Sequence, residues 1–373
     1  MNVALAHHWL VGMRGGEKVL EQFGQLFPDA PIYTLLAAPR QLSPALQRHS
    51  IHQSLLARLP AAARYYPRML PLFPAALRGL RLPRATQFLL TSDASLTKGL
   101  SYDPSLPHVC YCHSPPRYLW GMEETYLKHT AGLSRFGKSL FRQVIPRLRR
   151  FDHEAAQKVT HFIANSRYVQ KRIRQTYGRE STVIHPPVAI GDYSAHRPAE
   201  DFYLVVAQLV PYKRIDLAVK VFNSLGKRLV VIGGGAELGA LRARAKSNIT
   251  FLGRQPFPVV KDYLERCRAF VFPGVEDFGI TLVEAQAAGR PVISFAGGGA
   301  LETVVDGRTG VFFHEQTVEA LREAVLAFEE KSFRPEFCRA QAECYGPARF
   351  RAELKAFLAQ ALPQLFSRYG WPC

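Results

Sequence analysis

Short apolar runs alternate with amphipathic segments along most of the chain. The first run, Val3-Ala4-Leu5-Ala6, is followed by the glycines of 12–16 and by a helical pattern from about Glu17 to Leu26. A buried strand that leads through a glycine loop into a helix is the repeating unit of a parallel α/β sheet. Further runs of strand length in the first half lie at 88–91, 108–112 and 161–164. The pattern therefore predicts a doubly wound α/β domain.

The same alternation restarts after Pro186-Pro187. Two consecutive prolines interrupt regular structure and stiffen the chain, so they predict a linker. Beyond them, strand-like runs alternate with helical patterns at 203–207, 229–232, 249–252, 269–272 and 291–294. We therefore predict two domains in tandem, 1–187 and 188–349. Amphipathic patterns at about 317–330 and 349–366 predict the last helices.

The triple glycine at 233–235 is an incomplete dinucleotide-binding fingerprint, because Leu238 occupies the place of the third glycine. No stretch approaches 18 uninterrupted apolar residues, and the N-terminus lacks the basic and apolar regions of a signal peptide. We therefore expect a protein that is neither secreted by a signal peptide nor membrane-spanning.

Composition adds that the chain should fold without disulfides. Its 373 residues, of which 47% are apolar, suffice for two ordinary domains. Cys110 and Cys112 alternate along a predicted strand, so both should face one side of it. The other cysteines form no C-x-x-C pair: Cys267, Cys338, Cys344 and Cys373. We expect free thiols in a reducing cytosol and no metal or redox motif.

Nearly all of the net charge of +18 lies in the first half. Residues 1–187 carry 25 Lys and Arg against 10 Asp and Glu, whereas residues 188–373 carry 23 against 20. Two runs, 30–92 and 125–151, contain no acidic residue. The second contains Arg135, Lys138, Arg142, Arg147, Arg149 and Arg150. In the first, arginines are interleaved with apolar residues: Arg40, Arg48, Arg58, Arg64, Arg68, Arg78, Arg81 and Arg84 with Tyr65, Tyr66, Met69, Leu70, Leu72, Phe73 and Leu77.

Basic residues mixed with exposed apolar ones suit an anionic bilayer, near which each charge contributes about 1 kcal/mol. Solvated faces with core residues between them would give the same pattern. A nucleic-acid surface is a third interpretation, but no recognition motif accompanies the charge. We therefore predict an anionic membrane surface as a partner, and no nucleic acid.

The most informative segment is 269–288, where Glu276 and Glu284 flank a glycine that begins a helix. The run 269–272 is typical of a buried strand, and 280–288 of a helix with an Ala-rich face. Such a turn directs free backbone N–H groups of the helix start toward the ends of the strands, where they favour an anionic ligand. The donors would be the N–H groups of Phe278, Gly279, Ile280, Thr281 and Leu282.

Glu276-x7-Glu284, followed by residues 285–293, resembles the signature of the retaining glycosyltransferases of family 4 (GT4, glycosyltransferase group 1), which have the GT-B fold. Five more motifs occur in that family's order: Gly15-Gly16-Glu17, His113-Ser114-Pro115-Pro116-Arg117-Tyr118, Ala164-Asn165-Ser166, Val210-Pro211-Tyr212-Lys213-Arg214 and Gly297-Gly298-Gly299-Ala300-Leu301-Glu302. The sequence is most similar to bacterial O-antigen and exopolysaccharide mannosyltransferases.

The resemblance implies an α/β protein with two doubly wound Rossmann-like domains facing a cleft. Residues 1–187 would form the acceptor-side domain, onto which a C-terminal helix at about 350–373 packs back. Residues 188–349 would bind the nucleotide sugar. Closure around this donor would place a hinge near Pro186-Pro187.

The resemblance also implies the donor-binding residues. Lys213 would neutralise the diphosphate, and Glu284 would accept hydrogen bonds from the ribose hydroxyls. Gly15 and Gly16 would allow close approach to the diphosphate, because a Cβ there would collide with it. The N–H groups of 278–280 would bind the sugar, and those of 281–282 the phosphate. Each motif also has a purely structural interpretation, as a solvated side chain or an ordinary strand-to-helix turn.

Glu276 and His113 are the implied catalytic residues. Glu276 would contact the sugar hydroxyls and stabilise positive charge at the ring, whereas His113 would contact the donor sugar and organise the reacting centre. Retention would follow from front-face attack in which a leaving phosphate oxygen takes the acceptor proton, so no protein nucleophile is needed. A histidine that merely caps its strand is the structural alternative.

Position 208 departs from the family pattern. The family usually carries arginine there as a second phosphate ligand, but this chain has Gln208. Glutamine donates hydrogen bonds without charge, so we expect weaker phosphate binding, or compensation by Arg14, Arg214 or Arg254.

The implied function is transfer of a sugar to a polyprenyl-diphosphate-linked glycan during cell-surface polysaccharide biosynthesis, such as that of lipopolysaccharide. The subgroup implies mannose from GDP-mannose. We expect no metal or other cofactor, since no Asp-x-Asp occurs, and a cytoplasmic enzyme peripheral to the inner face of the plasma membrane. The alternatives are a UDP-sugar-dependent glycosyltransferase, an epimerase or phosphorylase of the same fold, and a catalytically weak nucleotide-binding scaffold on the membrane.

Overall fold

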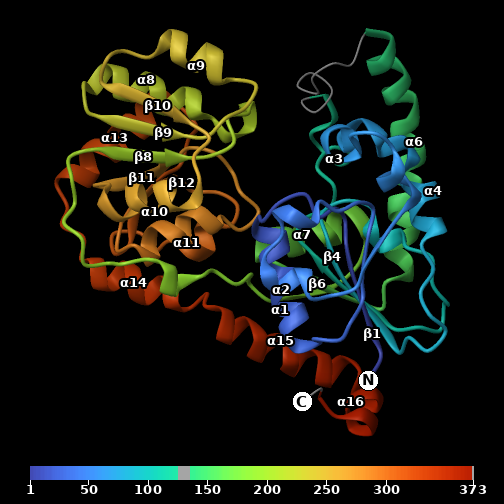
Figure 1. Ribbon diagram of the computed structural model, residues 1–373. Coiled ribbons are helices and arrows are strands. Elements are labelled where there is room, and N and C mark those ends of the chain that lie inside the picture. Colours follow the sequence, from blue (N-terminus) through green and yellow to red (C-terminus); the bar gives the residue numbers. More distant parts are fainter. Residues whose placement is uncertain (125–134, 372–373) are drawn as a thin grey trace. The chain divides into compact units, whose positions relative to one another are not determined.

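The computed structural model describes residues 1–124 and 135–371, which form two compact units (Figure 1). Unit 1 consists of Met1–Pro187 and Phe350–Cys373, and unit 2 of Val188–Arg349. The predicted linker, Pro186-Pro187, ends where unit 2 begins.

Unit 1 is built on a seven-stranded parallel sheet with the order β3-β2-β1-β4-β5-β6-β7. Its strands are β1 (Val3–His7), β2 (Ile32–Thr34), β3 (Ile51–Gln53), β4 (Phe88–Asp93), β5 (His108–Cys112), β6 (His161–Ala164) and β7 (Ser181–Val183). The strand order reverses between β1 and β4, which lie side by side at the centre of the sheet. In open α/β sheets, ligands bind beyond the carboxyl ends of the strands at such a switch point.

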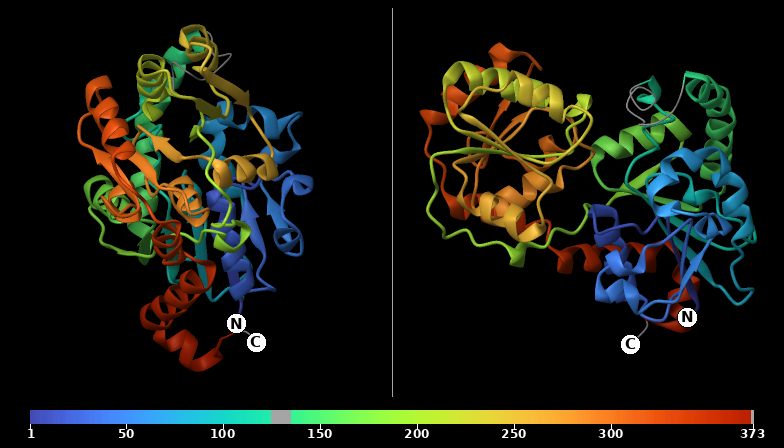
Figure 2. Two further views of the ribbon diagram at one scale, coloured as in Figure 1. Left: turned by 90° about the vertical axis from the view of Figure 1, so that its left-hand side faces the viewer. Right: turned by 45° about the horizontal axis from the view of Figure 1, so that its top comes forward.

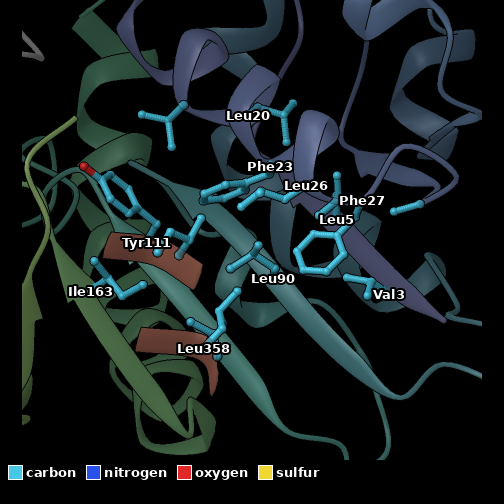
Figure 3. Packing of buried hydrophobic residues seen from close by; sticks show 14 of the residues in the cluster. Val3, Leu5, Leu20, Phe23, Leu26, Phe27, Leu90, Tyr111, Ile163 and Leu358 are labelled. Carbon is cyan, nitrogen blue, oxygen red and sulfur yellow. The ribbon is translucent and has the colours of Figure 1, made fainter. Parts of the chain in front are cut away.

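Helices cover both faces of this sheet. They are α1 (Gly15–Leu26), α2 (Pro44–Gln47), α3 (Ala62–Tyr65), α4 (Phe73–Gly79), α6 (Arg135–Lys158), α7 (Arg167–Tyr177), α15 (Pro347–Ala361) and α16 (Pro363–Tyr369), with 3-10 turns η1 (Pro39–Gln41), η2 (Leu55–Arg58), η3 (Tyr66–Leu72) and η4 (Thr97–Gly99). Val3 and Leu5 belong to a hydrophobic cluster that also contains residues of α1 and α15, and Figure 3 shows Phe23 and Leu358 among its members. Ala4, on the opposite face, packs with α4 and α6.

Unit 2 repeats the design with a six-stranded parallel sheet of order β10-β9-β8-β11-β12-β13. Its strands are β8 (Tyr203–Val206), β9 (Leu229–Ile232), β10 (Ile249–Gly253), β11 (Ala269–Phe272), β12 (Val292–Phe295) and β13 (Gly310–Phe313). Its helices are α8 (Ile215–Leu225), α9 (Leu238–Arg244), α10 (Phe257–Arg266), α11 (Ile280–Ala287), α12 (Ala300–Thr303), α13 (Val318–Glu329) and α14 (Pro335–Glu343), with 3-10 turns η5 (Ile190–Asp192) and η6 (Pro211–Lys213).

Alternate residues of the strands in unit 2 pack into two separate hydrophobic cores, one on each face of the sheet. Tyr203 and Val205 of β8 pack with α8, α9 and α13, whereas Leu204 packs with α10 and α11. Figure 2 shows these helices on the two faces of the sheet. This period of two is the pattern of a strand that is buried on both faces.

The structure confirms the predicted doubly wound α/β architecture in both units. Cys110 and Cys112 pack in one cluster on one face of their sheet, as predicted. The expectation of a single helix at 349–366 was wrong: it is divided at Leu362, because Pro363 cannot continue α15 and instead begins α16. None of the helices in the described part of the chain combines the length and hydrophobicity that a membrane span requires.

The arginine-rich run 30–92 only partly matches the expected mixture of exposed basic and apolar residues. Its arginines are exposed, but three of the apolar residues belong to the core of unit 1: Leu70, Phe73 and Leu77. Tyr65 and Leu72 are exposed as expected, and Leu55 and Leu59 join them. The segment 55–72 therefore carries the apolar surface, and the helix beyond it packs inward.

In the second acid-free run, 125–151, two arginines form ion pairs within unit 1. Residues 125–134 lie outside the described residues. Beyond them, Arg142 pairs with Glu124 and Arg149 with Glu123, both of which precede the run. These arginines are thus engaged within unit 1.

A buried set of charges fastens the end of β4 to α6. The Nζ atom of Lys98 lies 3.1 Å from Oδ2 of Asp93 and 2.5 Å from Oδ1 of Asp152. Asp152 also accepts hydrogen bonds from Nε1 of Trp120 and the hydroxyl of Tyr177, at 2.8 and 2.7 Å. Burial opposes the charge on Lys98, but the two carboxylates outweigh it and hold the pKa of Lys98 well above its ordinary value. Asp152 lies in α6, and its carboxylate belongs to this network.

Replacing Lys98 by methionine should destabilise the protein by about 3–5 kcal/mol, because two buried carboxylates would lose their shared cation. Chemical denaturation measures this change. Lys158→Met, at the exposed end of α6, is the matched control and should change stability by less than about 0.5 kcal/mol. Equal effects of the two substitutions would contradict the structural role of the network.

Candidate functional site

The candidate residues of unit 2 lie in two loops at its switch point, between β8 and β11. The chain leaves β8 and reaches Lys213 at the end of η6, and it leaves β11 through the loop that carries Glu276. A Cβ on Gly274 would lie 2.8 Å from Cα of Lys213. The backbones of the two loops are therefore in direct contact, which explains the glycine after Pro273.

Lys213 and Glu276 form an ion pair between Nζ and Oε1. The Nζ atom also lies 5.2 Å from the ring centroid of Tyr212 and 5.4 Å from that of Phe272, which are favourable positions for a cation. The side chain of Lys213 is 9% exposed, and that of Glu276 is 26% exposed. The structure thus brings these two predicted residues together, with the carboxylate more accessible than the cation. An anionic ligand would compete with Glu276 for Lys213.

The triple glycine at 297–299 holds the loop of Glu276 in place. The N–H of Gly299 donates to the carbonyl of Glu276 at 2.9 Å. A Cβ on Gly298 would lie 2.2 Å from that carbonyl oxygen, and one on Gly299 would lie 2.3 Å from Cα of Phe278. Gly298 also has a φ of +63°, a conformation that favours glycine. Close backbone packing therefore explains these glycines, since no other residue allows the loop of 297–299 to approach the backbone of Glu276 and Phe278 so closely.

Helix α11 begins where the sequence predicted, directly after Gly279, whose φ is +88°. The side chains of Phe278 and Leu282 are buried in the core, so these residues can offer a ligand only their backbone. The N–H of Leu282 already donates to the carbonyl of Gly279 at 3.0 Å. Ile280 and Thr281 occupy the first turn, where helical N–H groups lack intrahelical acceptors.

Glu284 lies one turn along α11 and is half-buried. Tyr193 lies beside it, a residue that the sequence did not single out. Burial, reinforced by the Glu284 carboxylate, raises the pKa of Tyr193 well above its ordinary value. Its hydroxyl therefore keeps its proton at neutral pH. No motif marked Tyr193, because the two residues are far apart in the sequence.

Gln208 is exposed after β8, beside a glycine loop. A Cβ on Gly233 would lie 1.8 Å from the carbonyl oxygen of Ala207, and one on Gly234 would lie 3.1 Å from Cγ and Nε of Arg254. Arg214, by contrast, donates from Nε to Asp216 at 3.1 Å. Arg254 therefore lies against the loop of Gly233 and Gly234, and this loop contacts Ala207, the residue before Gln208.

In unit 1 the candidate residues lie at the switch point between β1 and β4. Gly15 and Gly16 form the first turn of α1, and a Cβ on Gly16 would lie 3.1 Å from Cε1 of His7 and 3.5 Å from Nε2 of His113. His113 follows β5 directly. Its N–H donates to the carbonyl of Asp93 at 2.8 Å, and its carbonyl accepts from Asn165 at 2.9 Å.

A hydroxyl links His113 to a second histidine that the sequence did not single out. Oγ of Ser92 lies 2.8 Å from Nε2 of His113 and 3.0 Å from Nδ1 of His7. Burial, helped by the nearby His8, lowers the pKa of His113 to about 3, and burial also lowers the pKa of His7 well below its ordinary value. Both imidazoles are therefore neutral near pH 7.

Among the residues that the structure describes, no group of three or more His, Cys, Asp or Glu side chains is arranged to hold a metal ion.

Residues 193–343 match the family described as glycosyl transferases group 1. Unit 2 is a group 1 glycosyltransferase domain. The match contains both members of the Lys213–Glu276 pair and Glu284.

Curated relatives support this assignment over part of the chain. A GDP-mannose-dependent alpha-(1-6)-phosphatidylinositol monomannoside mannosyltransferase from Mycolicibacterium smegmatis is 28% identical over 210 residues, which are 48% of this chain and 54% of the relative. An uncharacterized glycosyltransferase of Methanocaldococcus jannaschii is 27% identical over 44% of this chain and 48% of the relative. The chain thus spans about half the length of these curated relatives.

Solved glycosyltransferase structures share the fold over nearly the whole chain. Anabaena HepE in complex with UDP and glucose has a TM-score of 0.71 at 14% identity, covering 96% of this chain and 99% of the other. A lipopolysaccharide outer core galactosyltransferase in its apo form has a TM-score of 0.68 at 14% identity, covering 97% and 100%. These likenesses confirm the predicted GT-B fold.

Gly299→Ala should destabilise the protein by about 1–3 kcal/mol, because the new methyl group would press into the backbone of Phe278 and displace the loop of Glu276. Chemical denaturation measures the loss. Gly239→Ala is the control: this glycine lies in α9 with open space around its Cβ position, so alanine should be neutral or stabilising. A Gly299→Ala protein as stable as the control would show that the loop does not depend on this contact.

Proposed function

We propose that the protein is a retaining glycosyltransferase that transfers mannose from GDP-mannose to a polyprenyl-diphosphate-linked glycan. The observation that carries the proposal is the Lys213–Glu276 pair at the switch point of a group 1 glycosyltransferase domain. The donor is supported by relatives that are named as GDP-mannose-dependent mannosyltransferases. The acceptor is proposed from the sequence resemblance to enzymes of surface polysaccharide assembly.

In this proposal the diphosphate displaces Glu276 from Lys213. The ammonium group then neutralises the leaving diphosphate, with help from the N–H groups at the start of α11. The released Glu276 contacts the sugar hydroxyls and stabilises the positive charge that develops at the ring. Glu284 accepts hydrogen bonds from the ribose hydroxyls. Because these groups supply the charge that the leaving group needs, the proposed reaction uses no metal.

The proposed chemical step retains the configuration of the anomeric carbon. The bond from that carbon to the diphosphate oxygen breaks, and its electron pair stays on the oxygen. The acceptor hydroxyl forms a bond to the same carbon from the same face, and its proton passes to the departing phosphate oxygen. In unit 1, His113, Gly15 and Gly16 take part in binding the donor.

Glu276→Ala should lower kcat about 100-fold, because the developing charge loses its carboxylate. Affinity for GDP should be unchanged or higher, since Lys213 no longer pairs with Glu276. The assay follows transfer from GDP-mannose labelled with ¹³C at the anomeric carbon to lipid-linked saccharides extracted from bacterial membranes, and NMR reads the product configuration. Glu315→Ala, the loss of an exposed carboxylate in the same unit, should leave turnover unchanged.

Two outcomes of this assay would change the proposal in different ways. Turnover of UDP-glucose, UDP-galactose or UDP-N-acetylglucosamine without turnover of GDP-mannose would keep the reaction and replace the donor. Nucleotide binding with no turnover of any donor would favour the membrane-associated scaffold. Full activity of Glu276→Ala would remove this residue from the catalytic site.

We also propose that segment 55–72 of unit 1 binds the anionic inner face of the plasma membrane. Leu55 and Leu72 are 68% and 50% exposed, and Arg64 and Arg68 lie over the ring of Tyr65, with their Cζ atoms 5.5 and 5.0 Å from its centroid. Exposed apolar side chains next to arginines suit the boundary between headgroups and acyl chains. This location would bring the enzyme to a lipid-linked acceptor.

Charge reversal of Arg58, Arg64 and Arg68 to glutamate should abolish most co-sedimentation with vesicles that contain anionic lipid, because each lost cation removes about 1 kcal/mol of attraction. Reversal of three exposed basic residues of unit 2, Arg244, Arg322 and Lys331, changes the net charge equally and should retain binding. Equal loss in both proteins would indicate that overall charge, and not this segment, attracts the vesicles.

A further inference from the structure

The register of the sheet in unit 1 creates a line of polar groups that ends at His113. His7, the last residue of β1, pairs in register with Ser92 of β4. Ser92 in turn contacts His113 at the end of β5, so that one buried hydroxyl lies between Nδ1 of His7 and Nε2 of His113. A single hydroxyl has one proton, so it can donate to only one of these two nitrogens.

The surroundings of Nε2 of His7 determine which atom donates in each of these hydrogen bonds. Its Nε2 atom is buried and has no hydrogen-bond partner within the described chain, but Oε1 of Glu17 lies 3.9 Å away. The other oxygen of Glu17 accepts the N–H of Arg14 at 3.1 Å, which holds the carboxyl group in place. A lone pair on Nε2 would face the lone pairs of Glu17, whereas a proton there is attracted to them. The proton of neutral His7 therefore belongs on Nε2.

The proton on Nε2 of His7 determines the positions of the protons on Ser92 and His113. Nδ1 of His7 then carries a lone pair and accepts the Ser92 hydroxyl at 3.0 Å; the other acceptor near this hydroxyl, the carbonyl of Gly16, is farther away at 3.4 Å. The oxygen of Ser92 can now only accept, so Nε2 of His113 must donate to it. The Nδ1 atom of His113 is left with a lone pair.

We propose that Glu17, His7 and Ser92 form a relay that holds His113 in the tautomer protonated on Nε2, so that its Nδ1 accepts a hydrogen bond from a hydroxyl group of the bound sugar. The proposal rests on the proposed function, because it deepens the role of His113. His113 is only half-buried, and its backbone is clamped by Asp93 and Asn165, so the ring is presented in a fixed position. His7 and Ser92 are positioning residues in this account.

The relay has a consequence for substrate choice. A neutral imidazole with a fixed acceptor recognises a hydroxyl and leaves that acceptor unpaired when the hydroxyl is absent. The enzyme should therefore discriminate against a donor whose sugar lacks the hydroxyl that faces His113. A ring free to exchange its tautomers would adapt and discriminate less.

The direct test is NMR of the full chain with ¹⁵N-labelled histidine at neutral pH, without ligand. The expected spectrum shows His113 protonated on Nε2 and unprotonated on Nδ1, and Ser92→Ala should convert it to a mixture of tautomers. Thr91→Val is the matched control: it removes the neighbouring buried hydroxyl, which contacts His108 at 2.9 Å, and should leave His113 unchanged. A proton on Nδ1 of His113 in the unaltered protein would overturn the proposal.

Kinetics provide the second readout. Ser92→Ala should lower kcat for sugar transfer about tenfold, the effect of one lost hydrogen bond, with a smaller change in KM for the donor. Ser92→Thr keeps the hydroxyl and should restore most of the rate, and thermal denaturation checks that each variant is folded. Ser92→Ala with the tautomer and rate of Thr91→Val would also overturn the relay. The predicted tautomer in a protein that turns over no nucleotide sugar would instead contradict the proposed function and leave the relay intact.

Discussion

The register of parallel strands at the switch point of each unit is the constraint on which that unit's candidate residues depend. In unit 1 the pairing of β1 with β4 sets His7 opposite Ser92, and β5 then delivers His113 to the same edge. In unit 2 the neighbouring strands β8 and β11 lead into the loops of Lys213 and Glu276. Because side chains alternate along a strand, a shift of one residue in β4 would turn Ser92 away from both histidines.

Close backbone contacts between the loops hold the charged groups of Lys213 and Glu276 in fixed positions. Gly274 lets one loop touch the backbone of Lys213, and Gly298 and Gly299 let another strand end press against the loop of Glu276. The resulting ion pair gives a poorly solvated lysine a partner, which avoids the cost of an unpaired buried charge. In the proposed reaction, a diphosphate replaces that partner with two negative groups. The ion pair thus connects the stability of the loops to the chemistry proposed for them.

The sequence predicts the structure best where chemistry and local structure coincide. The strand, glycine and helix of 269–288 are a local pattern, so the start of α11 after Gly279 could be predicted. The sequence could not reveal contacts that depend on register between distant strands. The hydroxyl of Ser92 between His7 and His113, and the charges of Asp93, Lys98 and Asp152, involve residues with no shared motif. The sequence also could not predict which apolar residues of the arginine-rich run are buried: Leu55 is exposed, whereas Phe73 is buried.

The proposed chemistry depends on Lys213 in unit 2 binding the diphosphate of a nucleotide sugar. The most direct measurement is calorimetric titration of the protein with GDP and with GMP, in the absence of divalent metal, for the unaltered chain and for Lys213→Ala. GDP should bind more tightly than GMP, and the substitution should remove most of this difference, because the second phosphate loses its cation. Equal affinities for GDP and GMP in the unaltered protein, or a difference that persists without Lys213, would contradict it.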